Sequence, residues 1–295
     1  MLTAHENQVP QVLRSVRKPS ARFNIRMPIA HLLLIAVAFF YLYPFLWMIS
    51  GSLKSLGGFF DQGLSLIPDA WQWRNYSDAW TTGQFGLYFG NTVFVTVLSV
   101  ILSVLFSSMA GYALARLRLP GKRVLLATIV VLSLLPKGNS ILPTYEIIQF
   151  LGLNDSLAAI ILLHIAGSVV GGSLFFAGYF LTLSREIEEA AIVDGANKLR
   201  IYWSIALPLS GPMIATQALF SFIGSWNDFL TPLIYTLGDP DLRTLAVGMY
   251  AFTSEHSQQW TLVCAGAVIS LIPIAVIFFL LQRYFVEGLA GAVKN

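Results

Sequence analysis

The sequence predicts an all-α polytopic membrane protein, and three observations lead to this prediction. Hydrophobic residues make up 56% of the 295 residues and charged residues only 11%, whereas about a quarter of the residues in a soluble domain are charged. The mean hydropathy of +0.70 agrees with this composition. The apolar residues also gather into long segments, and a spanning helix needs about 20 of them.

Six segments qualify as transmembrane helices, at about residues 28–50, 89–114, 124–135, 157–181, 211–235 and 262–281. The third segment is the shortest, because Pro136, Gly138 and Pro143 interrupt its end. The first is expected to be a retained helix and not a signal peptide, since its apolar run is long and no small-residue cleavage site follows. The expected organisation is a basic tail at 1–27, a six-helix domain at 28–284 and a C-terminal tail at 285–295.

The distribution of positive charge predicts that both termini lie in the cytoplasm. Most of the 18 Lys and Arg residues fall in the N-terminal tail, the second and fourth loops and the C-terminal tail. The first, third and fifth loops carry only Lys54, Arg74, Lys137 and Arg243. Loops rich in Lys and Arg stay on the cytoplasmic side of the membrane, so the asymmetry also supports an even number of spans.

The long first external loop contains four aromatic residues, Trp71, Trp73, Tyr76 and Trp80. Trp and Tyr favour the headgroup layer, which makes an interfacial belt one interpretation. A docking surface for an external partner is the other interpretation, and the sequence leaves both open.

Several function classes are disfavoured by what the sequence lacks. The sequence has four histidines that are far apart and a single cysteine, namely His5, His31, His164, His256 and Cys264. This spacing disfavours a structural zinc site, which needs Cys and His ligands in close pairs. A net charge of +3 gives no indication of nucleic-acid binding. The chain has no G-x-x-x-x-G-K-[ST] motif for ATP. A membrane-embedded enzyme would need a nucleophile–base pair or metal-ligand spacing, and we find neither.

The fourth loop, residues 184–212, predicts two short helices joined by a tight turn. Ser184 is placed to cap the first helix, and Glu186 and Glu188 fall in its first turn, where the helix dipole favours negative charge. Gly195 is the expected stop, because only glycine enters a left-handed turn without penalty. Asn197 is then expected to cap the second helix.

The second short helix is expected to present one apolar ridge and to end at Pro208. The ridge residues fall at helical spacing and are Leu199, Tyr202, Trp203 and Ala206. A protrusion with an acidic shoulder and an apolar ridge suits a groove on a cytoplasmic partner. A helix lying on lipid is the alternative; Lys198 and Arg200 favour it. The acidic residues of the loop oppose it at an anionic surface, namely Glu186, Glu188, Glu189 and Asp194.

The same loop resembles the EAA loop of ABC importer permeases. That pattern is E-A-A, three residues, G, nine residues and I-x-L-P, and it is matched at Glu189, Ala190, Ala191, Gly195, Ile205, Leu207 and Pro208. The resemblance implies that the loop, with Asp194 beside the glycine, is a coupling helix seated in a cleft of a separate ATPase. In that role Glu189 is the expected polar anchor, Ala190 and Ala191 permit close approach, and Gly195 sets the angle between the helices.

The resemblance covers nearly the whole chain. Residues 116–121, 226–230 and 291–294 resemble the carbohydrate-uptake branch, and the chain is most similar to the maltose-type second permease subunit. This implies a multi-pass protein of the bacterial cytoplasmic (inner) membrane that imports a sugar, oligosaccharide, polyol or glycerol phosphate. It also implies a second, homologous permease, an ABC ATPase dimer and an external solute-binding protein as partners. ATP and Mg are expected in the ATPase, with no cofactor in this chain.

Three adjacent residues of the fifth span, Trp226, Asn227 and Asp228, are the candidate pore residues. Ionisable groups inside a span are costly and often functional, and Trp226 offers a flat face for a sugar ring. Alternatively, Asp228 pairs locally and holds two spans together. A proton-coupled secondary transporter, with Asp228 or His164 carrying the proton, is the competing function, although we find no inverted repeat. We expect His164 to be an interhelical donor and Phe220 to face neighbours or lipid.

Small and polar residues elsewhere predict helix packing. Gly167 and Gly171 form a G-x-x-x-G pair, with Gly172 beside it, and such pairs let helices approach closely. Asn91 and Thr92 open the second span, and we expect them to form hydrogen bonds with another helix.

Overall fold

The computed structural model describes residues 26–134, 140–255 and 259–293, which fold into helices and turns with no strand among them. The all-α prediction is therefore confirmed for the described residues. The chain divides into two units, 1–45 and 46–295, and the division falls inside helix α1 (Arg26–Ser52). Within the first unit, large apolar side chains such as those of Leu32 and Phe40 are exposed, as expected for a helix surrounded by lipid.

Four described helices are long and apolar enough to cross a membrane: α1, α4 (Phe85–Arg116), α7 (Leu157–Thr182) and α14 (Trp260–Val293). A fifth exists only if residues 198–209 and 211–226, bent by 78°, count as one span. The predicted third span overlaps α5 (Lys122–Leu134), whose 13 residues cover about 20 Å of the roughly 30 Å hydrocarbon core. The chain is thus a multi-pass membrane protein, while six spans stay a prediction.

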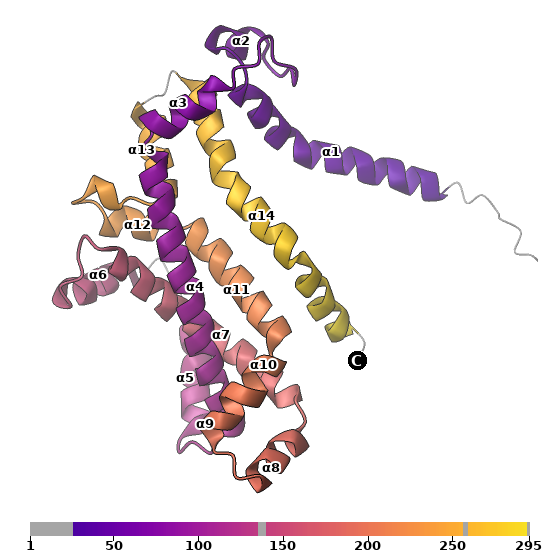
Figure 1. Cartoon of the computed structure of the whole chain (residues 1–295), viewed down its shortest axis with the longest axis vertical. Helices are drawn as coiled ribbons and strands as arrows, with labels where there is room; N and C mark the ends of the chain where they lie inside the picture. Colours follow the sequence, from indigo (N-terminus) through magenta and orange to yellow (C-terminus); the bar gives the residue numbers. More distant parts are fainter. Residues whose placement is uncertain (1–25, 135–139, 256–258, 294–295) are drawn as a thin grey trace, which may run out of the picture. The chain divides into compact units, whose positions relative to one another are not determined.

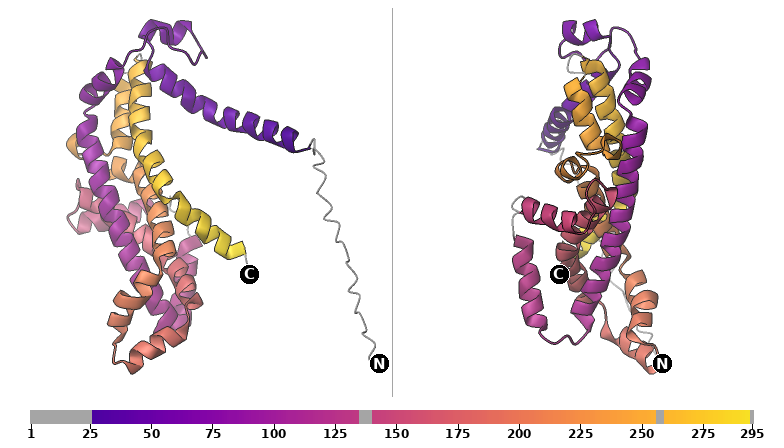
Figure 2. Two further views of the ribbon diagram at one scale, coloured as in Figure 1. Left: turned by 45° about the vertical axis from the view of Figure 1, so that its right-hand side comes forward. Right: turned by 90° about the vertical axis from the view of Figure 1, so that its left-hand side faces the viewer.

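The second unit contains α4, α7 and α11 (Gly211–Trp226) packed against one another, with α14 packed on α11 (Figure 1). Helix α6 lies across the direction of α4 (Figure 2). The shorter helices are α2 (Leu56–Asp61), α3 (Arg74–Thr82), α6 (Ile141–Phe150), α8 (Arg185–Val193), α9 (Lys198–Ile201), α10 (Leu207–Leu209), α12 (Leu230–Tyr235) and α13 (Leu245–Glu255). A π-helical turn at Tyr202–Ala206 precedes α10, and a 3₁₀ turn at Pro240–Leu242 precedes α13.

Helices α4 and α7 run in the same direction and pack closely. Val95 and Ile160 share one buried cluster, and Tyr112 and Phe180 share another further along both helices. The helix backbones approach at Gly111, where an added Cβ would lie only 2.4 Å from the Cβ of Phe176 and 2.9 Å from the backbone nitrogen of Ala177. No residue larger than glycine fits at this position without moving a helix.

The predicted fifth span, 211–235, is not one helix. Helix α11 ends at Trp226, three residues follow without helical structure, and α12 begins at Leu230. The amide of Asn227 donates to the Ile223 carbonyl (2.9 Å), and Asp228 Oδ1 accepts from the Thr231 backbone nitrogen (3.3 Å). These side chains compete with the helical ladder on both sides of the break, which explains it. Broken helices occur at membrane depth where they line a cavity.

The start of α4 is held by hydrogen bonds to the segment before α13. The Asn91 side-chain amide donates to the carbonyls of Asp241 (2.7 Å) and Arg243 (3.0 Å). The Thr92 hydroxyl accepts from the Leu245 backbone nitrogen at 2.7 Å. The prediction that Asn91 and Thr92 bond across elements is confirmed.

The structure describes the predicted first external loop and the two predicted tails to different extents. In the first external loop, Trp71 and Trp73 are exposed and stacked with ring centroids 6.2 Å apart, which fits both an interfacial belt and a docking surface. Helix α14 continues without a break through residue 285, where the C-terminal tail was predicted to begin. Almost all of the predicted tail at 1–27 lies outside the described residues.

Gly111→Ala is expected to destabilise the protein by about 1–3 kcal/mol, because the new methyl group overlaps the α7 backbone. Gly178→Ala is the matched control, since its Cβ would have nothing within 4 Å and an exposed helical Ala is favoured over Gly. Thermal unfolding of the purified variants in detergent measures both changes. A Gly111→Ala melting temperature equal to that of Gly178→Ala would contradict the close helix contact.

Candidate functional site

A cavity of about 830 Å³ lies between α4, α6, α7, α11 and α12. Its polar lining is dominated by hydroxyl groups and consists of Ser99, Ser103, Ser140, Thr144, His164, Ser168, Gln217, Ser221, Ser225, Asp228, Thr231 and Tyr235. Among the described lining residues Asp228 is the one carboxylate, and none is Lys or Arg. Hydroxyl, amide and imidazole groups both donate and accept hydrogen bonds, as the hydroxyls of a sugar also do.

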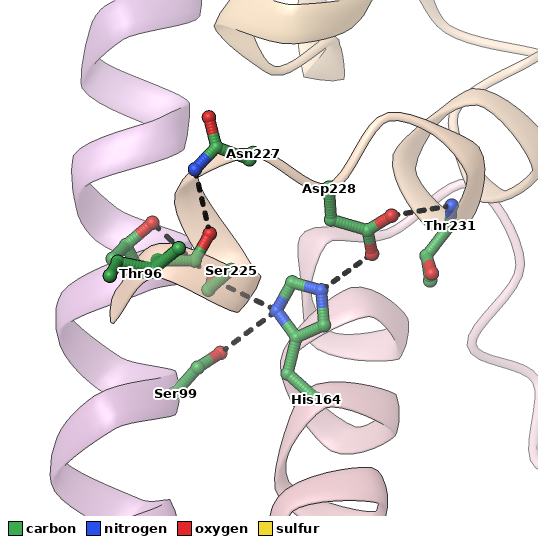
Figure 3. A network of polar contacts seen from close by, with 8 residues as sticks. Thr96, Ser99, His164, Ser225, Asn227, Asp228 and Thr231 are labelled. Atoms are coloured by element: carbon green, nitrogen blue, oxygen red, sulfur yellow. Dashed lines mark hydrogen bonds and ion pairs between the residues drawn. The ribbon is translucent and has the colours of Figure 1, made fainter. Parts of the chain in front are cut away.

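His164 of α7 joins three elements at the wall of this cavity (Figure 3). Its Nε2 lies 2.8 Å from Asp228 Oδ2, in the break between α11 and α12. Its Nδ1 lies 2.9 Å from the Ser225 hydroxyl of α11 and 3.5 Å from the Ser99 hydroxyl of α4. The structure therefore places Asp228 in a pair that links two spans and also in the cavity lining, and His164 is an interhelical hydrogen-bonding group as predicted.

A second cluster of polar side chains lies between α7 and α11. Gln217 Nε2 donates to the hydroxyls of Ser168 (2.9 Å) and Ser221 (3.3 Å), which lie 3.0 Å from each other. The buried Ser103 hydroxyl also lines the cavity, and within the described part of the chain it has no hydrogen-bond partner. A buried polar group without a partner costs free energy, so Ser103 is placed to bind water or a solute hydroxyl.

The predicted packing role of Gly167 and Gly171 is wrong. Both residues line the cavity, and an added Cβ at either one would have no described atom within 4 Å. Their missing side chains leave room in the cavity and do not admit a neighbouring helix. Gly172 does pack as predicted, because its Cβ would lie 2.5 Å from the Ser107 hydroxyl of α4. The G-x-x-x-G spacing alone does not tell these two uses of glycine apart.

Two of the three predicted pore residues lie outside the cavity lining. Trp226 is only 5% exposed, stacks on Phe222 with centroids 5.3 Å apart and meets the edge of Phe89 at 5.8 Å. Its faces are occupied by these rings, so it serves the core and not a sugar. Asn227 is exposed and bonds to its own helix. Asp228 alone lines the cavity.

Several lining residues were missed from the sequence. Phe220, predicted to face neighbours or lipid, lines the cavity, as does Phe175. Ser99 and Ser103 on α4 also line it. A sequence signal for the serines existed, because Ser99, Ser103 and Ser107 recur every four residues and so form a polar stripe on an apolar helix.

The loop between α7 and α11 has the predicted capped form. The Ser184 hydroxyl accepts from the Glu186 backbone nitrogen at 3.3 Å and caps α8. Gly195 has φ of +79°, a left-handed conformation that L side chains rarely adopt. The Asn197 side chain accepts from the Arg200 backbone nitrogen at 2.8 Å and caps α9. All three predicted features are confirmed.

The prediction that Pro208 ends the second helix is wrong. The chain stays helical through the π-helical turn 202–206 and through α10. The last helical residue is Leu209, and Ser210 is the C-cap. The proline ring would clash with the carbonyl four residues earlier in a regular α-helix. The wider turn just before Pro208 relieves this clash, which explains why the helix continues.

The predicted apolar ridge is also wrong, because the π-helical turn divides it between two faces. Tyr202 and Ala206 are buried, whereas Leu199 and Trp203 are exposed. A π-helical turn contains more residues than an α-helical turn. It therefore rotates Ala206 away from the side on which Leu199 lies.

The EAA-type positions divide in the same way. Three of them pack against the buried cluster around Tyr112 and Phe180, namely Ala191, Ile205 and Leu207. The other positions are exposed, namely Glu189, Ala190, Asp194, Gly195 and Pro208. Ala191, predicted to admit a partner, thus packs within this chain, while Glu189 and Ala190 stay at the surface.

Residues 107–291 match the family described as binding-protein-dependent transport system inner membrane component. The chain belongs to this family. The permease is 36% identical to a probable ABC transporter permease protein of Bacillus subtilis, YurM, over 90% of this chain and 86% of that protein. It is 33% identical to the arabinooligosaccharides transport system permease protein AraQ of Halalkalibacterium halodurans, over 88% of this chain and 93% of that protein.

A solved structure supports the same assignment. The permease shares a TM-score of 0.76 and 25% identity with a chain of a bacterial ABC transporter involved in the import of the acidic polysaccharide alginate, over 90% of this chain and 98% of that one. The resemblance to a permease subunit of an ABC importer is confirmed. The permease is a transporter subunit and not an enzyme, and ATP hydrolysis belongs to a separate ATPase. The proton-coupled alternative is overturned by this membership.

Asp228→Leu is expected to lower the stability of the permease by about 1–3 kcal/mol, since it removes the acceptor of both His164 and the Thr231 nitrogen. Asp228→Asn keeps an acceptor oxygen and similar shape, and a smaller loss is expected. Melting temperatures of the two variants test the difference. Equal melting temperatures would show that the His164 and Thr231 contacts do not stabilise the break between α11 and α12.

Proposed function

We propose that this permease forms one half of the translocation pathway of an ATP-driven importer and couples to its ATPase through residues 184–212. The observation that carries the proposal is the ordered conformation of this loop, in which a left-handed glycine joins two N-capped helices. A capped and packed loop has few alternative conformations, so it transmits a displacement instead of absorbing it.

The surface of the loop supports docking to a cytoplasmic protein. Six large apolar side chains are exposed on it, namely those of Ile187, Ile192, Val193, Leu199, Trp203 and Leu209. Apolar side chains gathered on a short helical protrusion suit a hydrophobic groove. Exposed Glu189 and Asp194 lie among them and disfavour a position against anionic lipid. Glu189 is the proposed polar anchor to the ATPase, and Ala190 permits close approach.

ATP binding would close two ATPase subunits around the loops of two homologous permeases. Closure displaces each loop and shifts the spans between two packings, one open to the outside and one to the cytoplasm. ATP and Mg bind in the ATPase, and this chain needs no cofactor of its own. An external solute-binding protein delivers the solute, as the family description indicates, and the assembly lies in the bacterial cytoplasmic membrane.

The cavity supports an uncharged sugar or oligosaccharide as the solute. Its hydroxyl-rich wall matches hydroxyl groups, and Phe175 and Phe220 provide apolar surface for a sugar ring. Asp228 would repel a carboxylate or phosphate, and no described lining residue offers a compensating Lys or Arg. A neutral sugar, oligosaccharide or polyol is therefore favoured over a glycerol phosphate.

Gly195→Asp is expected to abolish ATP-dependent uptake while the protein stays in the membrane, because a side chain is strained at φ of +79° and alters the angle between α8 and α9. Gly178→Ala, on the exposed face of α7, is the control. Uptake is measured in cells expressing the complete transporter, with immunoblotting of the membrane fraction. Normal uptake at normal abundance would remove the coupling role from this loop.

The permease in its complete transporter is expected to import one or more neutral solutes from a panel of maltotriose, raffinose, arabinotriose and sorbitol, and neither trigalacturonate nor glycerol 3-phosphate. Asp228→Asn removes the repelling charge, so it is expected to weaken the discrimination against the anionic solutes. Radiolabelled uptake measures both. Import of an anionic solute at a comparable rate would contradict the neutral cavity, and an unaltered range and rate in Asp228→Asn would assign Asp228 a structural role.

A further inference from the structure

One buried arginine connects α4 to both the end of α7 and the coupling loop. Arg116 is the last residue of α4, and its Nε lies 2.8 Å from Glu188 Oε1 in α8. The two side chains are only 4% and 11% exposed. Arg116 Nη2 also donates to the carbonyl of Leu183, the residue that ends α7, at 2.7 Å. The guanidinium therefore forms an ion pair with Glu188 and donates one hydrogen bond to Leu183, and a lysine ammonium lacks such a fixed planar arrangement of donors.

The part of the loop that follows α9 packs against the same face of α4. The hydroxyls of Tyr202 and Ser108 lie 2.8 Å apart and are buried. The ring of Tyr112 lies 5.4 Å from that of Tyr202 and 5.6 Å from that of Phe180. Ser108, Tyr112 and Arg116 are each four residues apart, so they form one stripe along the helix. This stripe contacts both α8 and the π-helical turn after α9.

The chain connects the loop only to α7 and α11, and α4 is remote in sequence. Yet α4 contributes Ser99 and Ser103 to the cavity wall. If a displacement of the loop also moved α4, three helices that line the cavity would move, namely α4, α7 and α11. The buried pair is suited to this task, because separating it would leave a charge without a partner in a poorly solvated site.

We propose that the stripe Ser108, Tyr112 and Arg116 makes α4 a third helix driven by the coupling loop, with Arg116 and Glu188 as the positioning pair. The proposal rests on the coupling function proposed above. The pair holds α8 and the cytoplasmic end of α4 as one rigid body, so the ATPase moves α4 directly. Without the pair, ATP-driven motion of the loop reaches α7 and α11 but is partly lost before α4.

The first test measures rigidity in the complete transporter reconstituted in nanodiscs. Spin labels are placed at Met109→Cys on α4 and Arg185→Cys on α8, both exposed positions, after Cys264→Ser removes the single cysteine of this chain. The distance distribution is expected to be the same in the nucleotide-free state and in the state trapped with ATP and vanadate. In the Glu188→Gln variant it is expected to broaden and to shift between the two states.

The second test measures coupling, which a loss of general stability would not alter selectively. The number of ATP molecules hydrolysed per molecule of the best-transported neutral solute is expected to rise about tenfold or more in Glu188→Gln, since a buried arginine then lacks its partner. Arg118→Met, exposed two residues after Arg116, is the control with an unchanged ratio. Arg116→Met combined with Glu188→Leu removes both charges and is expected to regain most of the coupling.

If Glu188→Gln does not assemble, Arg116→Lys decides. This variant keeps the charge beside Glu188 but loses the guanidinium nitrogen that donates to Leu183, so an intermediate ratio is expected. A wild-type ratio in both single variants, or a wild-type distance that changes with nucleotide, would overturn the proposal. Failure of the coupling function itself looks different. In that case the wild-type transporter neither hydrolyses ATP in a solute-dependent manner nor imports any solute.

Discussion

The close, parallel packing of α4 on α7 is the constraint on which the remaining features of the permease depend. Gly111 brings the two backbones together near one end, where the stripe of α4 holds the coupling loop. Further along the same two helices, Ser99, Ser103 and His164 face the cavity that α11 and α12 complete. The region that we propose to receive force from the ATPase and the cavity that we propose to hold a solute are therefore parts of one helix pair. A change in how α4 lies against α7 alters both.

Polar groups in this pair are placed where lipid cannot supply hydrogen bonds. Each such group must find a partner in the protein or in a cavity, because an unsatisfied group in hydrocarbon costs several kcal/mol. His164, Ser225 and Asp228 satisfy one another across three elements, and Gln217 does so with two serines. The same groups border the cavity, so the interactions that stabilise the bundle also give it a polar interior suited to a hydroxylated solute.

Local features could be predicted from the sequence, and features that depend on which side of a helix faces inward could not. Ser184, Gly195 and Asn197 act through their own backbone neighbourhood, and each lies as predicted. The surroundings of Trp226 and of the Gly167–Gly171 pair depend on neighbouring helices, which explains why the sequence did not predict where they lie. The break after Trp226 has a local cause in Asn227 and Asp228. It was not predicted because the apolar composition of residues 211–235 is typical of one continuous span. The π-helical turn, which places Ala206 on the side of Tyr202 and away from Leu199, was not anticipated from the sequence.

We propose that residues 184–212 face the cytoplasm and press against the ATPase. The most direct measurement places the photoreactive amino acid benzoylphenylalanine at Leu199, exposed on α9, and irradiates intact membranes that contain the complete transporter. We expect a covalent product between the permease and the ATPase, with a yield that changes when ATP and vanadate trap the closed state. Crosslinking to lipid alone, or to the external binding protein, would contradict it.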